Sequence, residues 1–214
     1  MNYSFRKKNK IVKYLVIHYT GMRNFELSYK KLSNPRSNVS THYLISREGI
    51  IFNLLCLRFK AWHAGLSKWK CHSNINDYSI GIELENRGHD FGYQSFTKKQ
   101  YLSLKKLIIF LKKNFYLLDE NILFHSDISP NRKQDPGEKF LAKEIAIDRF
   151  KNIKNSTCNT NIDKMLKIYG FHKYYINNYN SLCIMAVKRS LNYKRISSSI
   201  SKKFINDFYN LLFT

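Results

Sequence analysis

The chain has 214 residues and a hydrophobic fraction of 43%, which are typical of one well-cored domain with at most a small appendage. No apolar run reaches the roughly 20 residues that cross a bilayer, so we predict no transmembrane segment. The 37 Lys and Arg residues outnumber the 15 Asp and Glu residues, and the formal net charge is +22. This charge favours an anionic partner, although an AT-rich coding sequence also produces such an excess of lysine.

The first residues imitate a signal peptide, because the basic "MNYSFRKKNK" precedes the apolar "IVKYLVIHYTG". The apolar stretch is short, is interrupted by Lys13 and lacks a small-residue cleavage site. We therefore reject a signal peptide and predict a cytoplasmic protein. Reduced thiols are predicted as well, because no C-x-x-C pair occurs among the cysteines, which are Cys56, Cys71, Cys158 and Cys183.

Three β-rich runs come first, at residues 11–20, 41–55 and 78–86, and the second contains a turn at Glu48-Gly49. From Thr97, a plausible N-cap, the pattern changes to an amphipathic helix with apolar side chains at three- and four-residue steps. A short strand at "NILFHSD" follows. The order predicts an α/β fold in which helices flank a mixed central β-sheet, with polar groups at the sheet edge.

Beyond residue 150 the composition becomes polar and aperiodic, which indicates a linker at residues 151–160. Three short apolar stripes follow, at residues 162–169, 184–191 and 204–212, and each has helical spacing. We therefore predict a first domain at 1–150 and a small C-terminal helical domain at 161–214.

His125 and Asp135 lie ten positions apart in a segment that Pro130 and Pro136 stiffen, so their side chains could converge. His18 ends the first predicted strand. If the first and last strands of the sheet are neighbours, two histidines and one carboxylate meet with an open fourth position, as in catalytic zinc sites. A single histidine at a strand end is more often only a polar edge residue.

Five segments, in the same order, carry a family resemblance: "VIHYTG" at 16–21, "VSTHYLISREGIIFNLL" at 39–55, "AWHAGLSKW" at 61–69, "NDYSIGIELENRGH" at 76–89 and "HSDISPNRKQDPG" at 125–137. With these segments the chain resembles the zinc-dependent N-acetylmuramoyl-L-alanine amidases of the amidase-2 family, which are related to peptidoglycan recognition proteins. The final segment is the most specific of the five.

The resemblance implies that His18, His125 and Asp135 bind zinc. It also implies that Glu83 is the general base and acid, and that Lys133 stabilises the oxyanion. The main rival for the base is Glu85, which two positions further along a strand would point to the same face.

The implied substrate is peptidoglycan or a muropeptide, cleaved at the amide between N-acetylmuramic acid and L-alanine. By the same resemblance Trp62, His63 and Asn76 line the substrate groove. Asp127 and Arg132 are expected to pair and hold the shape of the metal-binding segment. We expect a packing role for His42, and assign no role to His72, His89 or His172.

Two alternatives stay open. The first is a recognition module that binds peptidoglycan without cleaving it, and the second is a basic nucleic-acid binder, for which no motif is found. The C-terminal part resembles a three-helix peptidoglycan-binding module, but it departs from that pattern at Val187, Lys188 and "RISSSIS". Sugar binding by this part, the choice between intact wall and soluble or 1,6-anhydro muropeptides, and the oligomeric state therefore stay open.

Overall fold

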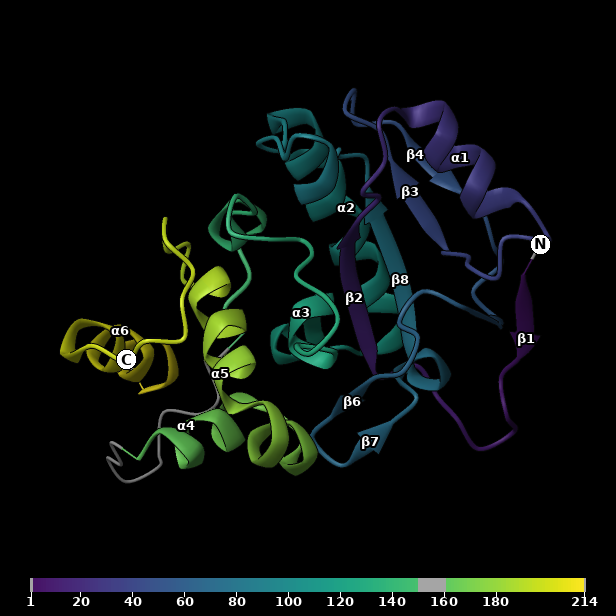
Figure 1. Cartoon of the computed structure of the whole chain (residues 1–214). Helices are drawn as coiled ribbons and strands as arrows, with labels where there is room; N and C mark the ends of the chain where they lie inside the picture. The colour runs from purple at the N-terminus through teal and green to yellow at the C-terminus, as the bar shows by residue number, and fades with distance from the viewer. Residues whose placement is uncertain (1, 150–160, 214) are drawn as a thin grey trace.

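A computed structural model describes residues 2–149 and 161–213, so the expected linker at 151–160 lies outside the described residues. Its centre is a five-stranded sheet in the order β4-β3-β8-β2-β9, where only the β3–β4 pair is antiparallel (Figure 1). The mixed central sheet that the sequence predicts is confirmed. The strands are β2 (Tyr14–Tyr19), β3 (Tyr43–Ile45), β4 (Ile51–Asn53), β8 (Ser79–Leu84) and β9 (Ile122–Phe124).

Side chains alternate between the two faces of the sheet, because successive residues of a strand point in opposite directions. In β2, Leu15 and Ile17 join the core beneath helix α2, whereas Tyr14 and Val16 join the core on the other face. His18 follows Val16 on that second face by the same alternation. The second face therefore carries polar groups where the strands end.

Helix α2 (Lys98–Phe115) covers the first face of the sheet. Thr97 caps it as predicted, and a capping box with Gln100 satisfies backbone groups at both positions. The apolar stripe is buried, and its members are Tyr101, Leu104, Leu107, Ile108 and Leu111. In the described part of the chain no helix combines the length and the apolar character needed to span a bilayer.

The remaining elements before residue 150 are short. Helix α1 (Phe25–Ser33) begins at the cap Asn24, and α3 (His125–Ile128) follows directly on β9. Two small antiparallel pairs join β1 (Tyr3–Phe5) to β5 (Phe59–Ala61) and β6 (Lys68–Trp69) to β7 (His72–Ser73). Single 3₁₀ turns lie at Ile75–Tyr78, His89–Phe91, Asp119–Asn121 and Ala142–Ile145.

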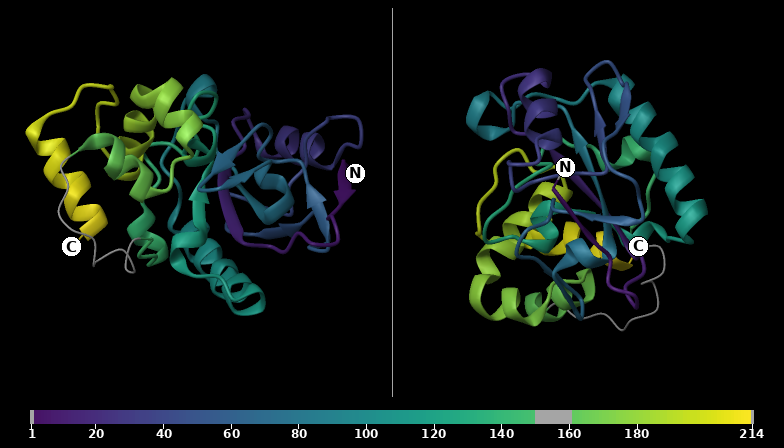
Figure 2. Two further views of the ribbon diagram at one scale, coloured as in Figure 1. Left: turned by 90° about the horizontal axis from the view of Figure 1, so that it is seen from below. Right: turned by 90° about the vertical axis from the view of Figure 1, so that its right-hand side faces the viewer.

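Three C-terminal helices pack on the second face of the sheet, opposite α2 (Figure 2). They are α4 (Ile162–Tyr169), α5 (Lys173–Ser190) and α6 (Lys202–Phe213), which confirms the three predicted stripes. One apolar cluster contains Val16 and Leu123 of the sheet together with Tyr169, Val187 and Phe208 of these helices. The C-terminal helices therefore share an apolar cluster with the sheet. The division into two domains stays a prediction.

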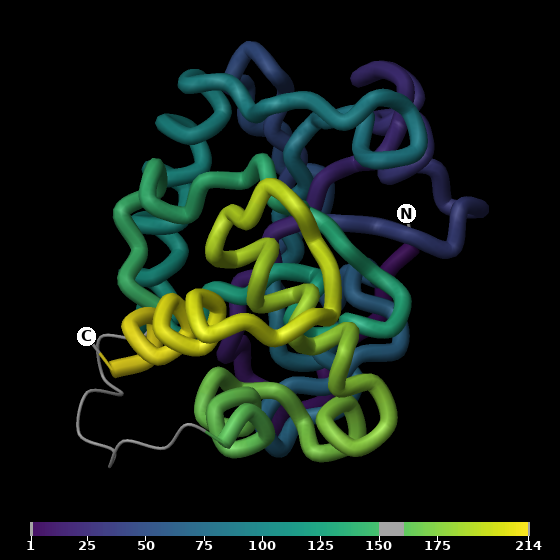
Figure 3. The backbone as a smooth tube through the Cα atoms, turned by 60° about the vertical axis from the view of Figure 1, so that its left-hand side comes forward, coloured from purple at the N-terminus to yellow at the C-terminus, as the bar shows by residue number. Residues whose placement is uncertain are grey.

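The C-terminal part of the chain lies beside the segment that follows β9 (Figure 3). Side-chain hydrogen bonds join the two. The Tyr175 hydroxyl donates to the Ile128 carbonyl oxygen at 3.0 Å. The Asn192 side-chain amide donates to the carbonyl oxygens of Glu138 and Phe140 at 2.9 and 2.7 Å. These contacts fix the backbone on both sides of Asp135.

Candidate active site

The register of the parallel strands brings the predicted residues together. His18 of β2 lies directly beside Glu83 of β8, and Ile17 lies beside Phe124 of β9. His125 follows Phe124, so both histidines leave neighbouring strands at the same edge of the sheet. The condition stated from the sequence, that the first and last strands are neighbours, is confirmed.

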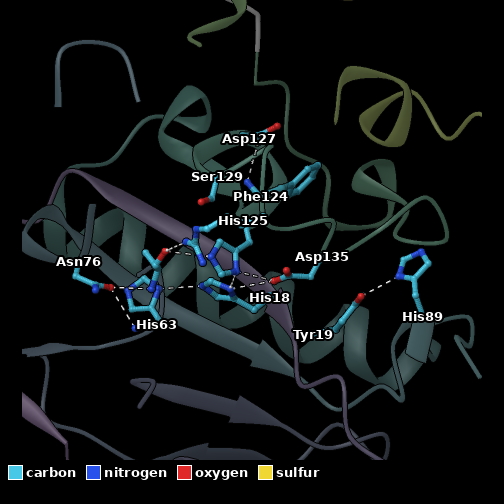
Figure 4. A network of polar contacts seen from close by, with 12 residues as sticks. His18, Tyr19, His63, Asn76, His89, Phe124, His125, Asp127, Ser129 and Asp135 are labelled. Carbon is cyan, nitrogen blue, oxygen red and sulfur yellow. Dashed lines mark hydrogen bonds and ion pairs between the residues drawn. The ribbon is translucent and has the colours of Figure 1, made fainter. Parts of the chain in front are cut away.

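Three buried donor atoms converge at this edge (Figure 4). His18 Nδ1 lies 2.9 Å from His125 Nδ1 and 3.1 Å from Asp135 Oδ2, and His125 Nδ1 lies 3.0 Å from the same oxygen. Among the described residues, this is the group of histidine, cysteine and carboxylate side chains whose arrangement suits a metal ion. The predicted convergence of His18, His125 and Asp135 is confirmed.

Neighbouring hydrogen bonds determine which nitrogen of His18 carries a proton. The Ser79 hydroxyl donates to the Ile75 carbonyl oxygen at 2.7 Å, so its oxygen accepts the proton of His63 Nε2 at 3.1 Å. His63 Nδ1 then has no proton and accepts from His18 Nε2 at 2.9 Å. A neutral imidazole carries one proton, so His18 Nδ1 presents a lone pair to the other two donors.

His125 is fixed in the same way. Its Nε2 lies 3.2 Å from the Ala64 carbonyl oxygen, which can only accept a hydrogen bond, so in the neutral ring the proton is on Nε2 and the lone pair is on Nδ1. When both imidazoles are neutral, two lone pairs and a carboxylate oxygen meet with no proton between them, an arrangement that suits a cation. Donors on one tetrahedral zinc ion at about 2.0–2.1 Å lie about 3.3 Å apart. The observed separations of 2.9, 3.0 and 3.1 Å are close to this value, and the donor set fits zinc.

The protonation states suit metal binding. Burial is the largest cause that lowers the pKa of His18 to about 4, and a protonated His125 would lower it further. The Asp135 carboxylate favours the protonated form of His18, but this effect is smaller. Burial alone would raise the pKa of Asp135, but its carboxylate form is stabilised by His125 and His18 whenever these rings are protonated, which brings the pKa of Asp135 below its usual range. At neutral pH His18 is therefore a neutral imidazole and Asp135 an ionised carboxylate, which are the forms of these groups that bind metals.

Glu83 lines the same cavity as the three donors. Its side chain is buried, and Oε2 has no hydrogen-bond partner among the described residues. Burial, and then the carboxylate of Asp135, raise the pKa of Glu83 well above its usual value, although Lys133 opposes the shift. A buried carboxyl group with a raised pKa beside a metal site is well suited to proton transfer.

Glu85 occupies different surroundings. Strand β8 ends at Leu84, so the alternation that would place Glu85 beside Glu83 does not extend to it. The Glu85 carboxylate accepts the backbone N–H of Arg47 at 2.8 Å and lines a separate cavity. This position favours Glu83 over Glu85 as the base.

The cavity around the three donors has a volume of about 420 Å³. Lys133 lines it and is exposed, and its backbone N–H donates to the Ser129 carbonyl oxygen at 2.9 Å. Sequence analysis did not single out several other lining residues, because no local chemical pattern distinguishes them. These residues are Tyr19, Thr20, Met22, Lys31, Leu32, Val39, Asp90 and Gln134.

The three predicted substrate contacts have different positions. His63 lines the cavity, and its ring fits against β8 because Gly81 lacks a side chain; a Cβ there would lie 2.5 Å from His63 Cγ. The Trp62 indole N–H donates to Ser4 Oγ at 2.9 Å, and Asn76 Oδ1 accepts the backbone N–H of His63 at 3.1 Å. Trp62 and Asn76 do not line the cavity, so they act on the position of the loop that carries His63.

The expected pair of Asp127 with Arg132 is wrong. Asp127 is buried and pairs with Arg149 at 2.6 Å, and it also accepts the Tyr169 hydroxyl at 2.9 Å and the Phe124 N–H at 2.8 Å. Arg132 instead donates to the carbonyl oxygens of Ala64 and Leu66 at 3.1 and 2.8 Å. Both residues hold the segment at 125–137 in place, but each does so through a partner distant in sequence.

The remaining histidines make structural contacts. His42 is buried, accepts the Gly81 N–H at 3.0 Å and donates to the Phe59 carbonyl oxygen at 3.1 Å, which confirms its packing role. His89 Nδ1 lies 2.8 Å from the Tyr19 hydroxyl at the side of the site (Figure 4). Its Nε2 lies 3.1 Å from Glu138 Oε2. The described cysteines, Cys56, Cys71 and Cys183, are free.

Comparisons with known proteins agree with this geometry. The profile of the family described as N-acetylmuramoyl-L-alanine amidase (Amidase_2) matches residues 7–138. N-acetylmuramoyl-L-alanine amidase AmiD of Escherichia coli is 37% identical over 147 residues, 63% of this chain and 52% of AmiD. The 1,6-anhydro-N-acetylmuramyl-L-alanine amidase AmpD of Haemophilus influenzae is 42% identical over 103 residues, 48% of this chain and 54% of AmpD.

Solved structures extend the likeness to the C-terminal helices. AmpDh3 of Pseudomonas aeruginosa with an anhydromuramic pentapeptide has a TM-score of 0.78 and 26% identity, and the match covers 94% of this chain and 91% of that one. E. coli AmiD with anhydro-N-acetylmuramic acid-L-Ala-D-gamma-Glu-L-Lys has a TM-score of 0.76 and 26% identity, with coverage of 96% and 91%. The chain spans about half the length of the curated relatives it matches. On the family match and the shared fold, this chain belongs to the N-acetylmuramoyl-L-alanine amidase family.

Proposed function

We propose that this chain is a zinc hydrolase that cleaves the amide bond between the lactyl group of N-acetylmuramic acid and L-alanine in muropeptides or peptidoglycan. The observation that carries the proposal is the convergence of three buried donor atoms beside a buried carboxyl group, all in one cavity. The relatives support the choice of bond, because AmiD was solved with an anhydromuramyl peptide described as its substrate.

His18, His125 and Asp135 would hold the zinc ion. When bound, zinc acts as a Lewis acid that polarises a carbonyl group and makes water more acidic. Glu83 accepts the proton of the attacking water molecule and returns it to the departing amine of L-alanine. Burial prepares Glu83 for both steps, since its raised pKa makes it a stronger base than an exposed glutamate and lets it hold the proton until the amine leaves.

Lys133 supplies positive charge that stabilises the negative charge formed during the reaction. The tetrahedral intermediate carries an oxyanion, and the Lys133 ammonium group at the cavity wall stabilises a charge that is absent from the ground state. Lys31 and Arg132 line the same cavity. Together with the net charge of +22, they favour the carboxylate-bearing stem peptides of peptidoglycan as substrates.

His63 has two tasks in this proposal. Its ring lines the cavity, where it can contact substrate, and its Nδ1 accepts from His18 Nε2, which keeps His18 in the tautomer that binds metal. Trp62 and Asn76 hold the loop that carries His63 in position, through the hydrogen bond of Trp62 to Ser4 and that of the His63 backbone N–H to Asn76.

Mass spectrometry of defined muropeptides tests the proposal. The zinc-loaded protein is incubated with muropeptides that carry either reducing or 1,6-anhydro N-acetylmuramic acid, and separately with intact sacculi. We expect release of a free peptide with L-alanine at its amino terminus. A protein that binds these ligands but releases no peptide is a recognition module, and this result would reject the hydrolase.

A further inference from the structure

The outward face of α2 combines exposed apolar side chains with positive charge. The helix contains six lysines and no acidic residue over its 18 positions. Leu102, Ile109 and Phe110 are 61%, 58% and 54% exposed, and their spacing places them on one side of the helix, away from the sheet. Tyr116, the C-cap of the helix, is 92% exposed. Exposure of large apolar side chains to water is unfavourable, so their burial against a partner would be favourable.

Most of the positive charge on this face is not compensated. Lys99 pairs with Glu48 at 3.0 Å, and Lys112 pairs with Asp119. Within the described residues, no acidic side chain lies within ion-pair distance of the other four lysines of α2, which are Lys98, Lys105, Lys106 and Lys113. The apolar side chains are therefore bordered by lysines that are available to an anionic partner.

We propose that the outer face of α2 docks on the surface of an anionic lipid bilayer. Leu102, Ile109 and Phe110 enter the headgroup region, and the lysines beside them approach lipid phosphates, as in helices that lie in the plane of a membrane surface. A nucleic acid would use the lysines but leave the apolar side chains in water. A second copy would bring two positive faces together, which is unfavourable.

Docking through α2 leaves the catalytic cavity open. No α2 residue lines that cavity. Helix α2 stands on one side of the sheet and the C-terminal helices stand on the other, so both remain accessible to separate partners (Figure 2). The first turn of α2 nevertheless contacts the catalytic edge of the sheet, because Gln100 Nε2 donates to the Glu85 carbonyl oxygen at 2.9 Å.

Co-sedimentation with vesicles tests the proposal. The full chain is mixed with vesicles of phosphatidylcholine alone or of phosphatidylcholine with phosphatidylglycerol, and we expect a strong preference for the latter. The pair Lys106→Gln and Lys113→Gln should weaken partitioning by roughly 10- to 30-fold, since each lysine near such a surface contributes about fivefold. The pair Leu102→Ser and Phe110→Ser should also weaken it, at unchanged net charge.

Two matched variants control for position. Lys7→Gln with Lys8→Gln removes the same charge from exposed sites elsewhere, and Ile11→Ser removes another apolar side chain that is 68% exposed. Both should bind vesicles like the parent protein, and every variant should keep its melting temperature.

Three results would overturn the proposal. In the first, the protein shows no preference for anionic vesicles. In the second, the control variants lose as much binding as the α2 variants. In the third, the variant Leu102→Ser with Phe110→Ser binds vesicles as well as the parent protein does. Loss of a dimer in this variant, detected by light scattering, would instead show that a second copy of the chain binds this face.

Discussion

Replacement of Glu83 by glutamine separates catalysis from metal binding and stability. The amide has nearly the same shape as the carboxyl group but cannot accept a proton, so kcat should fall by roughly 10²- to 10⁴-fold, the usual contribution of positioned acid and base catalysis. Zinc should stay, because Glu83 is not among the three converging donors.

The same change should stabilise the metal-free protein. The Glu83 carboxyl group is buried, Oε2 lacks a partner among the described residues, and its pKa is raised, so ionisation is less favourable in the folded state than in the unfolded state. Removing this cost should raise the free energy of unfolding by about 0.5–2 kcal/mol. In a protein of this size that corresponds to roughly 1–8 °C in melting temperature.

The sign of the stability effect depends on pH. A carboxyl group whose pKa is higher in the folded state destabilises the protein at pH values above its ordinary pKa of 4.5, and it loses this effect below that pH, where both states are protonated. The gain from Glu83→Gln should therefore be present at pH 7 and vanish near pH 4. Bound zinc offsets the charge of the carboxylate, so the measurement requires metal-free protein.

Three measurements on one preparation check these expectations: elemental analysis for zinc, mass spectrometry of muropeptide turnover for kcat, and thermal unfolding of the metal-free protein. Glu85→Gln is the matched control, with activity near that of the parent because Glu85 faces Arg47 rather than the cavity. An inactive Glu85→Gln beside an active Glu83→Gln would refute the assignment of the base. Loss of zinc or of stability in Glu83→Gln would refute the account of its surroundings.

Four further expectations concern other parts of the molecule. His18→Ala should reduce bound zinc from one ion per chain to almost none, since it removes one of three ligands; full occupancy by elemental analysis would exclude His18 from the site. Lys133→Ala should keep zinc and lower kcat with little change in KM, because the oxyanion exists only after attack; an effect on KM alone would make Lys133 a binding residue. Deletion from residue 161 onward should weaken zinc binding and lower the melting temperature, because it removes Tyr169 from Asp127 and exposes the shared core; a truncated protein with normal zinc affinity would support an independent catalytic domain. Burial lowers the pKa of His42 to about 3, so as the pH falls from 7 to 5 His42 takes up a proton in the unfolded state but not in the folded state. This difference should lower the free energy of unfolding by about 2 kcal/mol over that range. Urea unfolding of His42→Gln should lack this part of the pH dependence.

The elements near the site are readable from the sequence because their patterns are local. The β-rich run that contains "YLVIHY" and the cap at Thr97 both predict structure from a few neighbouring residues, and the structure has a strand and a helix there. The pairing of β2 with β9 is different, since it joins residues more than one hundred positions apart. The sequence predicts the metal ligands only on the condition that these strands meet, or through the family resemblance.

Local reasoning fails where distant residues compete. Asp127 was expected to pair with Arg132, five positions away, but the fold supplies Arg149 and Tyr169 in buried surroundings where a charged partner matters more. Glu85 is a candidate for the general base only if the strand alternation that includes Glu83 continues to it, but strand β8 ends at Leu84. The polar segment after residue 150 predicts two separate units. The sequence alone does not show that the C-terminal helices pack on one face of the sheet, because that face forms only when distant strands pair.

The attachment of the C-terminal helices to the metal-binding segment has a consequence for the newly made protein. During synthesis the amino-terminal part of the chain leaves the ribosome first, so His125 and Asp135 emerge before Tyr175 and Asn192. The last two residues make hydrogen bonds to the backbone on either side of Asp135. We expect the nascent chain to capture its metal late, when synthesis is almost complete. A wall-cleaving activity would then be withheld from unfinished chains, and translation arrested before Tyr175 should yield products that neither retain zinc nor hydrolyse muropeptides.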